Sequence, residues 1–138
     1  MENVFDTFRP EGFHSVTPYL IVDKPLILSE FLKKTFFATE IDRSTDPESG
    51  NIANCILQIG DTCFMISQAK HPYKSMQTSF YLYVEDVDML HRRAIENGAI
   101  LEFEPADMPY DDRQSGIMDP CGNYWWISKR LVKKGYHE

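Results

Sequence analysis

Histidine and cysteine side chains are the groups in this chain most able to act as metal ligands, nucleophiles or proton carriers. They are His14, His71, His91, His137, Cys55, Cys63 and Cys121. The set contains neither a CxxC pair nor another close spacing that a zinc site or a disulfide framework needs. The sequence also lacks a GxSxG nucleophile turn and a Gly-rich phosphate loop. We therefore expect inert thiols in a reducing cytoplasm, and we expect His91, on a helix pattern, to be exposed to solvent.

The charge balance narrows the classes of partner. The chain has 138 residues, with 14 Lys and Arg against 21 Asp and Glu, which gives a formal net charge of −7. An acidic chain is a poor partner for nucleic acid or for an anionic membrane surface. Its apolar runs are shorter than the roughly 20 residues of a spanning helix, and its first residues lack a secretory pattern. We expect one cytoplasmic globular domain over residues 1–138, without nucleic-acid or membrane partners.

The elements that must position any site fall into two similar halves. Residues 14–22 and 78–84 are strand patterns, and each is followed directly by a helix pattern. Further strand patterns cover residues 38–46, 51–59 and 62–68 in the first half and residues 99–103, 114–118 and 124–128 in the second. The sequence therefore predicts an α+β fold of two βαβββ modules, at about residues 14–69 and 78–130. A frayed or helical basic tail is expected to follow.

A shift of 62 positions superposes the two halves without a gap. Tyr19 then falls on Tyr81, and the turn at residues 60–61 falls on residues 122–123. The same shift places Phe64 on Trp126. Agreement of strand, helix start and turn in one register indicates an internal repeat.

Strand alternation predicts two different faces for these strands. One face is wholly apolar and should pack under the helices; it comprises Leu20, Val22, Cys63, Met65, Leu82, Val84, Trp125 and Ile127. The other carries rings and hydroxyls, from Thr17, Tyr19, Ile21, Thr62, Phe64, Ile66, Ser79, Tyr81, Tyr83, Tyr124, Trp126 and Ser128. Rings mixed with hydroxyls favour a ligand cavity. An aromatic core or a dimer interface is the alternative interpretation.

Three segments carry a family resemblance: VTPYLIVD, FYLYVEDVDMLHRRAIENGA and DMPYDDRQSGIMDPCGNYWWISK. With them, residues 14–130 resemble the vicinal oxygen chelate superfamily, which includes glyoxalase I, bleomycin and fosfomycin resistance proteins and extradiol dioxygenases. The chain is most similar to small single-domain glyoxalase-like or PhnB-like proteins. This resemblance implies two βαβββ modules, each an incomplete cup, and completion of the cups in a homodimer.

The resemblance also implies where a divalent metal would be held. Family enzymes use His, Gln or Glu from the first and last strands of each module, and those positions fall on Thr17, Phe64, Ser79 and Trp126. Hydroxyls are weak ligands for such metals, and the two aromatic side chains offer none. We therefore expect no metal and no other cofactor.

Arg113 is the charged residue that the family pattern places nearest the cup, just before one of its strands. Its guanidinium could contact an anionic group of a ligand. A structural ion pair with Asp111 or Asp112 is the alternative.

Two classes of function stay open from the sequence. The first is a glyoxalase/bleomycin-resistance-like protein that binds a cationic or aromatic small molecule without metal, using Thr17, Tyr19, Phe64, Ser79, Tyr81, Arg113, Tyr124 and Trp126. The second is a lyase, isomerase or dioxygenase of the same superfamily, with a divalent metal held by displaced ligands or with none. Whether a reaction is catalysed stays open, and no catalytic residue is assigned.

Overall fold

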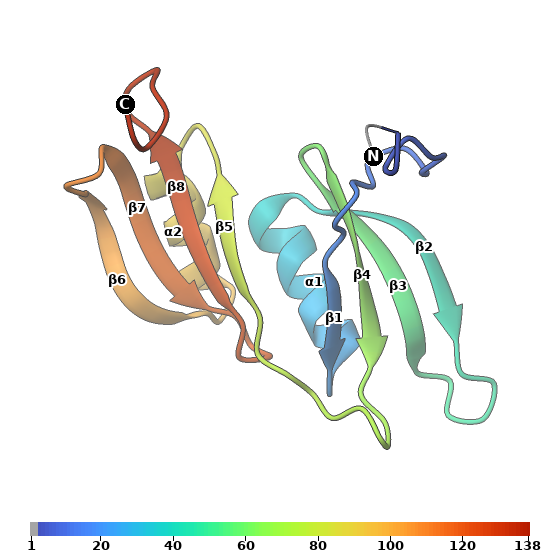
Figure 1. Cartoon of the computed structure of the whole chain (residues 1–138). Coiled ribbons are helices and arrows are strands. Elements are labelled where there is room, and N and C mark those ends of the chain that lie inside the picture. The colour runs from blue at the N-terminus through green and yellow to red at the C-terminus, as the bar shows by residue number, and fades with distance from the viewer. Residues whose placement is uncertain (1–2) are drawn as a thin grey trace.

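The structure is a computed structural model that describes residues 3–138 and contains two mixed four-stranded sheets, each with one helix (Figure 1). The first module comprises β1 (Tyr19–Val22), α1 (Pro25–Phe36), β2 (Thr39–Thr45), β3 (Ile52–Ile59) and β4 (Thr62–Gln68). The second comprises β5 (Ser79–Tyr83), α2 (Val87–Glu96), β6 (Ile100–Asp107), β7 (Asp112–Met118) and β8 (Tyr124–Arg130). This arrangement confirms the predicted α+β fold of two βαβββ modules.

The two sheets share one topology. Their strand orders are β1-β4-β3-β2 and β5-β8-β7-β6. The first strand of each module pairs in parallel with the last, and the remaining pairs are antiparallel. A parallel pair requires a crossover connection, which the helix begins in each module. Each sheet therefore has a face covered by its helix, which we call the helix face, and an opposite face, which we call the open face.

Both helices begin at residues that favour a helix N-terminus. Proline fits the first turn of α1, where its missing N–H leaves no helical bond unmade. Helix α2 is capped by the Asp86 carboxylate, which accepts a hydrogen bond from the Met89 amide at 3.1 Å. The helices also contact each other, since Arg93 Nε donates to the Thr35 carbonyl at 3.3 Å. No helix within residues 3–138 is long and apolar enough to cross a membrane.

The helix faces of both sheets meet in one hydrophobic core. Its fully buried members include Leu20, Leu28, Leu32, Leu57, Ile66, Ile117 and Ile127. Aromatic rings cross the boundary between the modules, because the Phe80 ring stacks on Trp125 at 4.3 Å and lies 6.4 Å from the tilted ring of Phe64, centroid to centroid. Packing of aromatic rings across this boundary fixes the two sheets relative to each other.

The loop of residues 119–123 is part of this core. The Asp119 carboxylate accepts hydrogen bonds from the Asn123 amide at 3.1 Å and from Trp125 Nε1 at 2.8 Å. Both Asp119 and Asn123 are buried. A buried carboxylate is stable only when donors surround it, and here the loop backbone and an indole supply them.

Unequal turn lengths break the 62-residue register between the modules. Strands β3 and β4 are joined by two residues, whereas five residues join β7 and β8. As a result, Tyr19 pairs with Met65, while Tyr81 pairs with Trp126. The predicted place of Phe64 on the ligand face is therefore wrong: its side chain lies on the helix face and is 3% exposed. Met65 holds the position that corresponds to Trp126.

Candidate functional site

Three stacked aromatic rings lie on the open face of the second module. The Trp126 ring lies 6.0 Å from Phe103 at an interplanar angle of 18°, and 5.4 Å from Tyr124 at 3°. The indole Nε1 donates to Ser79 Oγ at 2.7 Å, which fixes the orientation of the ring. We call Phe103, Tyr124 and Trp126 the aromatic shelf.

Gly116 leaves room on the sheet for two rings of the aromatic shelf. This residue pairs with both Phe103 and Trp126 across the neighbouring strands. A Cβ atom at this position would come within 2.7 Å of Phe103 Cε1 and 2.8 Å of Trp126 Cζ3. Glycine is therefore the residue that leaves room for two aromatic rings above one backbone position.

A shallow hollow of about 440 Å³ extends from the shelf toward β7. Its lining residues are Tyr81, Phe103, Met108, Tyr110, Gln114 and Trp126. Gln114 is held by its neighbours, since its Nε2 donates to Ser128 Oγ at 2.8 Å and its Oε1 accepts from the Tyr110 hydroxyl. Apolar rings with a few oriented polar groups are the usual composition of a small-molecule site.

A fully buried carboxylate, Asp112, lies behind Tyr81 at one end of this face. It accepts hydrogen bonds from the Tyr81 hydroxyl, from the Tyr136 hydroxyl at 2.7 Å and from Arg130 Nη1 at 3.1 Å. Burial by itself would raise the pKa of Asp112, but these donors outweigh burial and hold the pKa below its ordinary value. We call Asp112, Tyr81, Tyr83, Arg130 and Tyr136 the carboxylate end.

The hydroxyls of Tyr81 and Tyr136 stay protonated at neutral pH. Burial and the hydrogen bond to Asp112 raise the pKa of Tyr81. Burial and the bonds to Tyr83 and Asp112 also raise the pKa of Tyr136. Both phenols therefore act as hydrogen-bond donors to an ionised carboxylate.

The open face of the first module has the same hydrogen-bonding frame with other side chains. The Tyr19 hydroxyl lies 2.7 Å from Ser67 Oγ, which also accepts from Asn54 Nδ2 at 2.8 Å. Met65 stands where the second module has its central indole. A flexible thioether in place of a flat ring offers no stacking surface.

The structure brings together four of the eight predicted site residues, Ser79, Tyr81, Tyr124 and Trp126, on the second open face. Tyr19 lies on the open face of the first module. Thr17 precedes β1, and its hydroxyl donates to the His14 carbonyl at 2.8 Å. Phe64 instead lines an apolar cavity of about 820 Å³ between the modules.

Arg113 lies on the helix face, so the predicted place of its side chain beside the cup is wrong. Its guanidinium pairs with Asp88 of α2 at 2.9 Å and with Asp107 at 3.0 Å. The structural ion pair is thus the correct alternative, although its partners are not Asp111 and Asp112. Strand β7 begins at Asp112, and alternation from there places Asp112 and Gln114 on the open face and Arg113 on the other.

His91 is buried at 4% exposure rather than exposed, with Nε2 3.3 Å from the Glu104 carboxylate. Helix α2 packs against β6 and β7, and this residue faces them. The sequence prediction had overlooked that a histidine four residues after Val87 shares the buried stripe of the helix. Neither side chain belongs to the open face.

The cysteines are free thiols. Burial raises the pKa of both Cys55 and Cys121 to about 11. A nucleophilic cysteine needs a lowered pKa, so these two thiols are chemically quiet at neutral pH.

The positions that the family pattern assigns to a metal do not fit one. The hydroxyls of Thr17 and Ser79 are engaged by His14 and Trp126. Trp126 itself and Met65 occupy the last-strand positions. Among residues 3–138, no group of three or more His, Cys, Asp or Glu side chains is placed to hold a metal ion.

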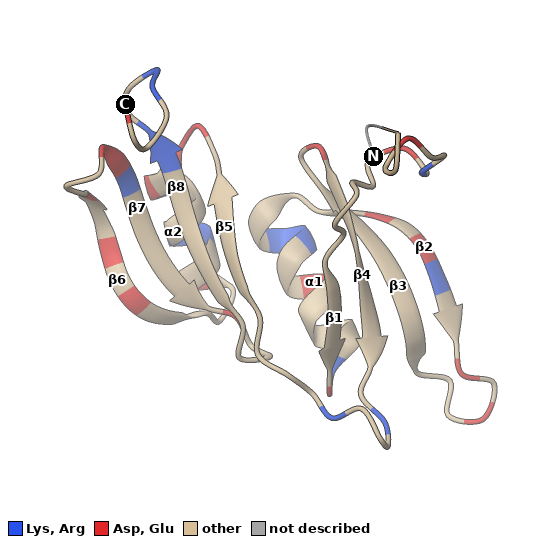
Figure 2. Ribbon diagram, viewed as in Figure 1, with Lys and Arg blue, Asp and Glu red and all other residues tan. Residues whose placement is uncertain are grey.

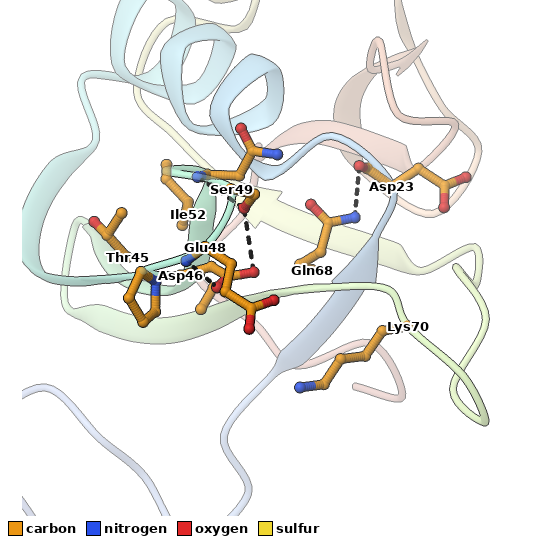
Figure 3. Close-up of a pocket in the computed structure, with 11 residues that line it drawn as sticks. Asp23, Thr45, Asp46, Glu48, Ser49, Ile52, Gln68 and Lys70 are labelled. Atoms are coloured by element: carbon orange, nitrogen blue, oxygen red, sulfur yellow. Dashed lines mark hydrogen bonds between the residues drawn. The ribbon is translucent and has the colours of Figure 1, made fainter.

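A third pocket, which is polar and has a volume of about 720 Å³, lies beside the β2–β3 hairpin (Figure 3). The Asp46 carboxylate accepts from the Glu48 amide at 3.0 Å and from Ser49 Oγ at 3.2 Å. These bonds lower the pKa of Asp46. Asp46 thus holds the hairpin turn together, which is a structural task.

Charged side chains avoid the middle of the second sheet. Acidic residues recur along β6, whereas β7 and β8 are uncharged over most of their length (Figure 2). Charges gather where β7 begins and β8 ends, at Asp112, Arg113, Lys129 and Arg130. The open face is therefore an aromatic surface with one charged end.

Paired βαβββ modules with an aromatic open face define a cup-forming α+β protein of the vicinal oxygen chelate type. The model of the Glyoxalase/Bleomycin resistance protein/Dioxygenase superfamily matches residues 28–127. The chain belongs to this superfamily.

Known relatives share the fold at low sequence identity. An uncharacterized protein of Mycobacterium tuberculosis is 28% identical over 135 residues, covering 90% of this chain and 79% of the relative. The structure of TioX from Micromonospora sp. ML1 superposes with a TM-score of 0.72 at 23% identity, covering 84% of this chain and 98% of TioX. The structure of a PhnB protein from Bacillus cereus superposes with a TM-score of 0.67 at 14% sequence identity, covering 84% of this chain and 99% of the PhnB protein. The structure of the fosfomycin resistance protein FosX from Mesorhizobium loti superposes with a TM-score of 0.61 at 17% sequence identity, covering 83% of this chain and 89% of FosX.

Proposed function

We propose that this protein binds a small aromatic molecule on the open face of its second module, without a metal ion. The observation that carries the proposal is the aromatic shelf, in which Trp126 is held parallel to Tyr124 by a hydrogen bond to Ser79. Aromatic rings whose orientation is already fixed can stack on a planar ligand without first losing side-chain freedom.

A positive charge on the ligand should strengthen binding. The chain carries a formal net charge of −7, which attracts cations over long range. The indole of Trp126 and the ring of Tyr81 offer π faces to a cation on contact. We therefore propose aromatic cations as the preferred class of ligand.

Titration with N-methylacridinium tests this proposal, and calorimetry and tryptophan fluorescence both measure the binding. We expect one bound dye per chain, weaker binding at high salt, and weaker binding of neutral acridine. Trp126→Ala should weaken binding about tenfold or more, because the central ring of the shelf is lost. Tyr73→Ala, which removes an exposed ring in the linker between the modules, is the matched control and should bind like the wild type. Unchanged binding in Trp126→Ala would contradict the proposal.

An enzyme of the same superfamily is the second candidate function. The Tyr81 hydroxyl, which lines the hollow and contacts Asp112, is the group best placed to exchange a proton with a bound molecule. Product analysis after incubation with glyoxalase, thiol-transfer and dioxygenase substrates tests this candidate. Turnover that disappears in Tyr81→Phe would favour the enzyme over a binding protein.

We also propose that the chain is a cytoplasmic homodimer. The open faces leave large rings in solvent: Tyr19 is 55% exposed, Tyr81 is 43% exposed and Tyr83 is 57% exposed. A second copy that covers these rings would complete each cup. Analytical ultracentrifugation checks the mass; a monomer at all concentrations would contradict this part of the proposal.

A further inference from the structure

Tyr136 contacts the other residues of the carboxylate end in the way that a bound ligand would. Its hydroxyl donates to Asp112 Oδ2 at 2.7 Å and lies 2.7 Å from the Tyr83 hydroxyl. Its ring stacks on the Arg130 guanidinium, 4.2 Å from Cζ to the ring centroid. A carboxylate, a hydroxyl and a planar cation thus contact one phenol group from three sides.

The segment that carries this phenol lies outside both modules. Residues 131–138 follow β8 and turn back beside the second sheet (Figure 1). In the first module the residues that follow β4 form the linker to β5 instead. The phenol is therefore an addition to the repeat rather than part of it.

Few contacts hold this segment in place. Arg130 donates to the Lys134 carbonyl at 2.9 Å and to the Gly135 carbonyl at 3.1 Å. The Leu131 amide donates to the Asp111 carbonyl at 2.9 Å. Tyr136 supplies the remaining hydrogen bonds to the sheet, yet it is 47% exposed. A segment with little buried surface opens at low cost in free energy.

The position of Tyr136 is continuous with the hollow beside the aromatic shelf. Tyr81 lines that hollow and donates to the same Asp112 oxygen as Tyr136. A molecule lying on the shelf therefore needs to extend only past Tyr81 to reach the phenol position. The two places form one elongated site when the segment is displaced.

We propose that Tyr136 is an internal ligand, and that a ligand with a hydroxylated aromatic ring displaces it from Asp112 and Arg130. This inference rests on the proposed binding function and adds a phenol group to the aromatic ligand proposed there. The ring is required for stacking on Arg130, and the hydroxyl is required because Asp112 would otherwise lose a donor in a buried place. Residues 131–138 act as a latch that competes with the ligand.

Limited trypsin digestion in the presence of p-cresol tests the latch. Cleavage after Lys133 and Lys134, followed by mass spectrometry, reports displacement of the segment. We expect p-cresol to accelerate this cleavage several-fold in the wild-type chain, whereas toluene, which lacks the hydroxyl, leaves it unchanged. Asp112→Asn should abolish the effect of p-cresol.

Two variants make the result decisive. Tyr136→Phe keeps the ring but loses both hydrogen bonds of the hydroxyl, so lower p-cresol concentrations should release the segment. A chain ending at Arg130 should bind p-cresol directly in calorimetry, and more tightly than toluene. If the shortened chain does not fold, Tyr136→Phe alone decides the question.

The outcomes separate this inference from the proposed function. Cleavage that p-cresol leaves unchanged or slows, while N-methylacridinium still binds, overturns the latch and leaves the shelf as the binding site. Loss of both responses overturns the two proposals together. Acceleration by p-cresol that survives in Asp112→Asn would show that the phenol binds elsewhere, which also overturns the latch.

Discussion

Asn54 in β3 and Gln114 in β7 make the same hydrogen bond in the two modules. Each side-chain amide donates to a serine hydroxyl of the last strand at 2.8 Å, to Ser67 in one case and to Ser128 in the other. The internal repeat therefore extends from the strands to individual polar side chains of the open face. Against this common frame, the aromatic shelf and the carboxylate end distinguish the second module, which concentrates the proposed binding there.

Gly116→Ala should destabilise the protein and weaken binding of aromatic ligands. The added methyl group would overlap the rings of Phe103 and Trp126, which must then shift. Overpacking of this kind costs about 1–3 kcal/mol. Urea denaturation measures the loss, and adding Phe103→Leu should recover part of it by removing one of the two clashes. A fully stable Gly116→Ala chain would show that the shelf does not rest on this glycine.

Asp112→Asn should lower stability most at neutral pH. The pKa of Asp112 is lower in the folded chain than in the unfolded one, so the ionised carboxylate stabilises the fold above the unfolded pKa of about 4. That contribution is lost as the pH falls through the lower folded value. The stability difference between wild type and variant should therefore shrink in acid, as urea denaturation at a series of pH values can show. Asp42→Asn, exposed in β2, is the control; a difference independent of pH would contradict the assignment.

Arg113→Met should lower the stability of the fold slightly and leave ligand binding unchanged. Its ion pairs with Asp88 and Asp107 are partly exposed, and such pairs contribute less than about 1 kcal/mol. Because exposed pairs are screened by salt, the difference in melting temperature from wild type should narrow at high ionic strength. Reduced affinity for N-methylacridinium in this variant would return Arg113 to the binding site.

Purified protein incubated with nickel, zinc, manganese or iron and then desalted should retain far less than one metal ion per chain. The family ligand positions carry hydroxyls already engaged by other groups, or side chains such as Trp126 that supply no ligand atom. Elemental analysis gives the stoichiometry, and melting temperatures with and without chelator provide a second measure. Retention of about one ion per chain would require ligands at other positions.

The strands and helices were predictable because their patterns are local. Apolar residues at helical spacing and β-formers between turn residues set the two modules and their order. Helix α2 ends at Glu96, shortly before Gly98, whose positive φ of 101° does not continue a helix. Strand β6 is longer than predicted and runs to Asp107, since pairing with β7 overrides its polar composition.

The residues of the open face were predicted only in part. The number of residues in a turn sets the register of the next strand, and the register decides which of its side chains point to the open face. Gly60–Asp61 and Gly122–Asn123 match in sequence, yet one pair is a whole turn and the other ends a longer loop. A one-residue slip moves every side chain of a strand to the opposite face, as Phe64 shows. Strand β7 begins at Asp112, so alternation places the Arg113 side chain on the helix face and not on the predicted open face. Tyr136 was beyond prediction, because its position depends on long-range contacts that follow no periodicity.

The loop of residues 119–123 is the whole DPCGN segment, and its Asp119 and Asn123 side chains form hydrogen bonds within the core. Asp119 secures Trp125, on the face away from any bound molecule. A substitution at Asp119 therefore perturbs the packing of the core, whereas a substitution at Trp126, whose side chain lies on the opposite face from Trp125, changes the aromatic shelf.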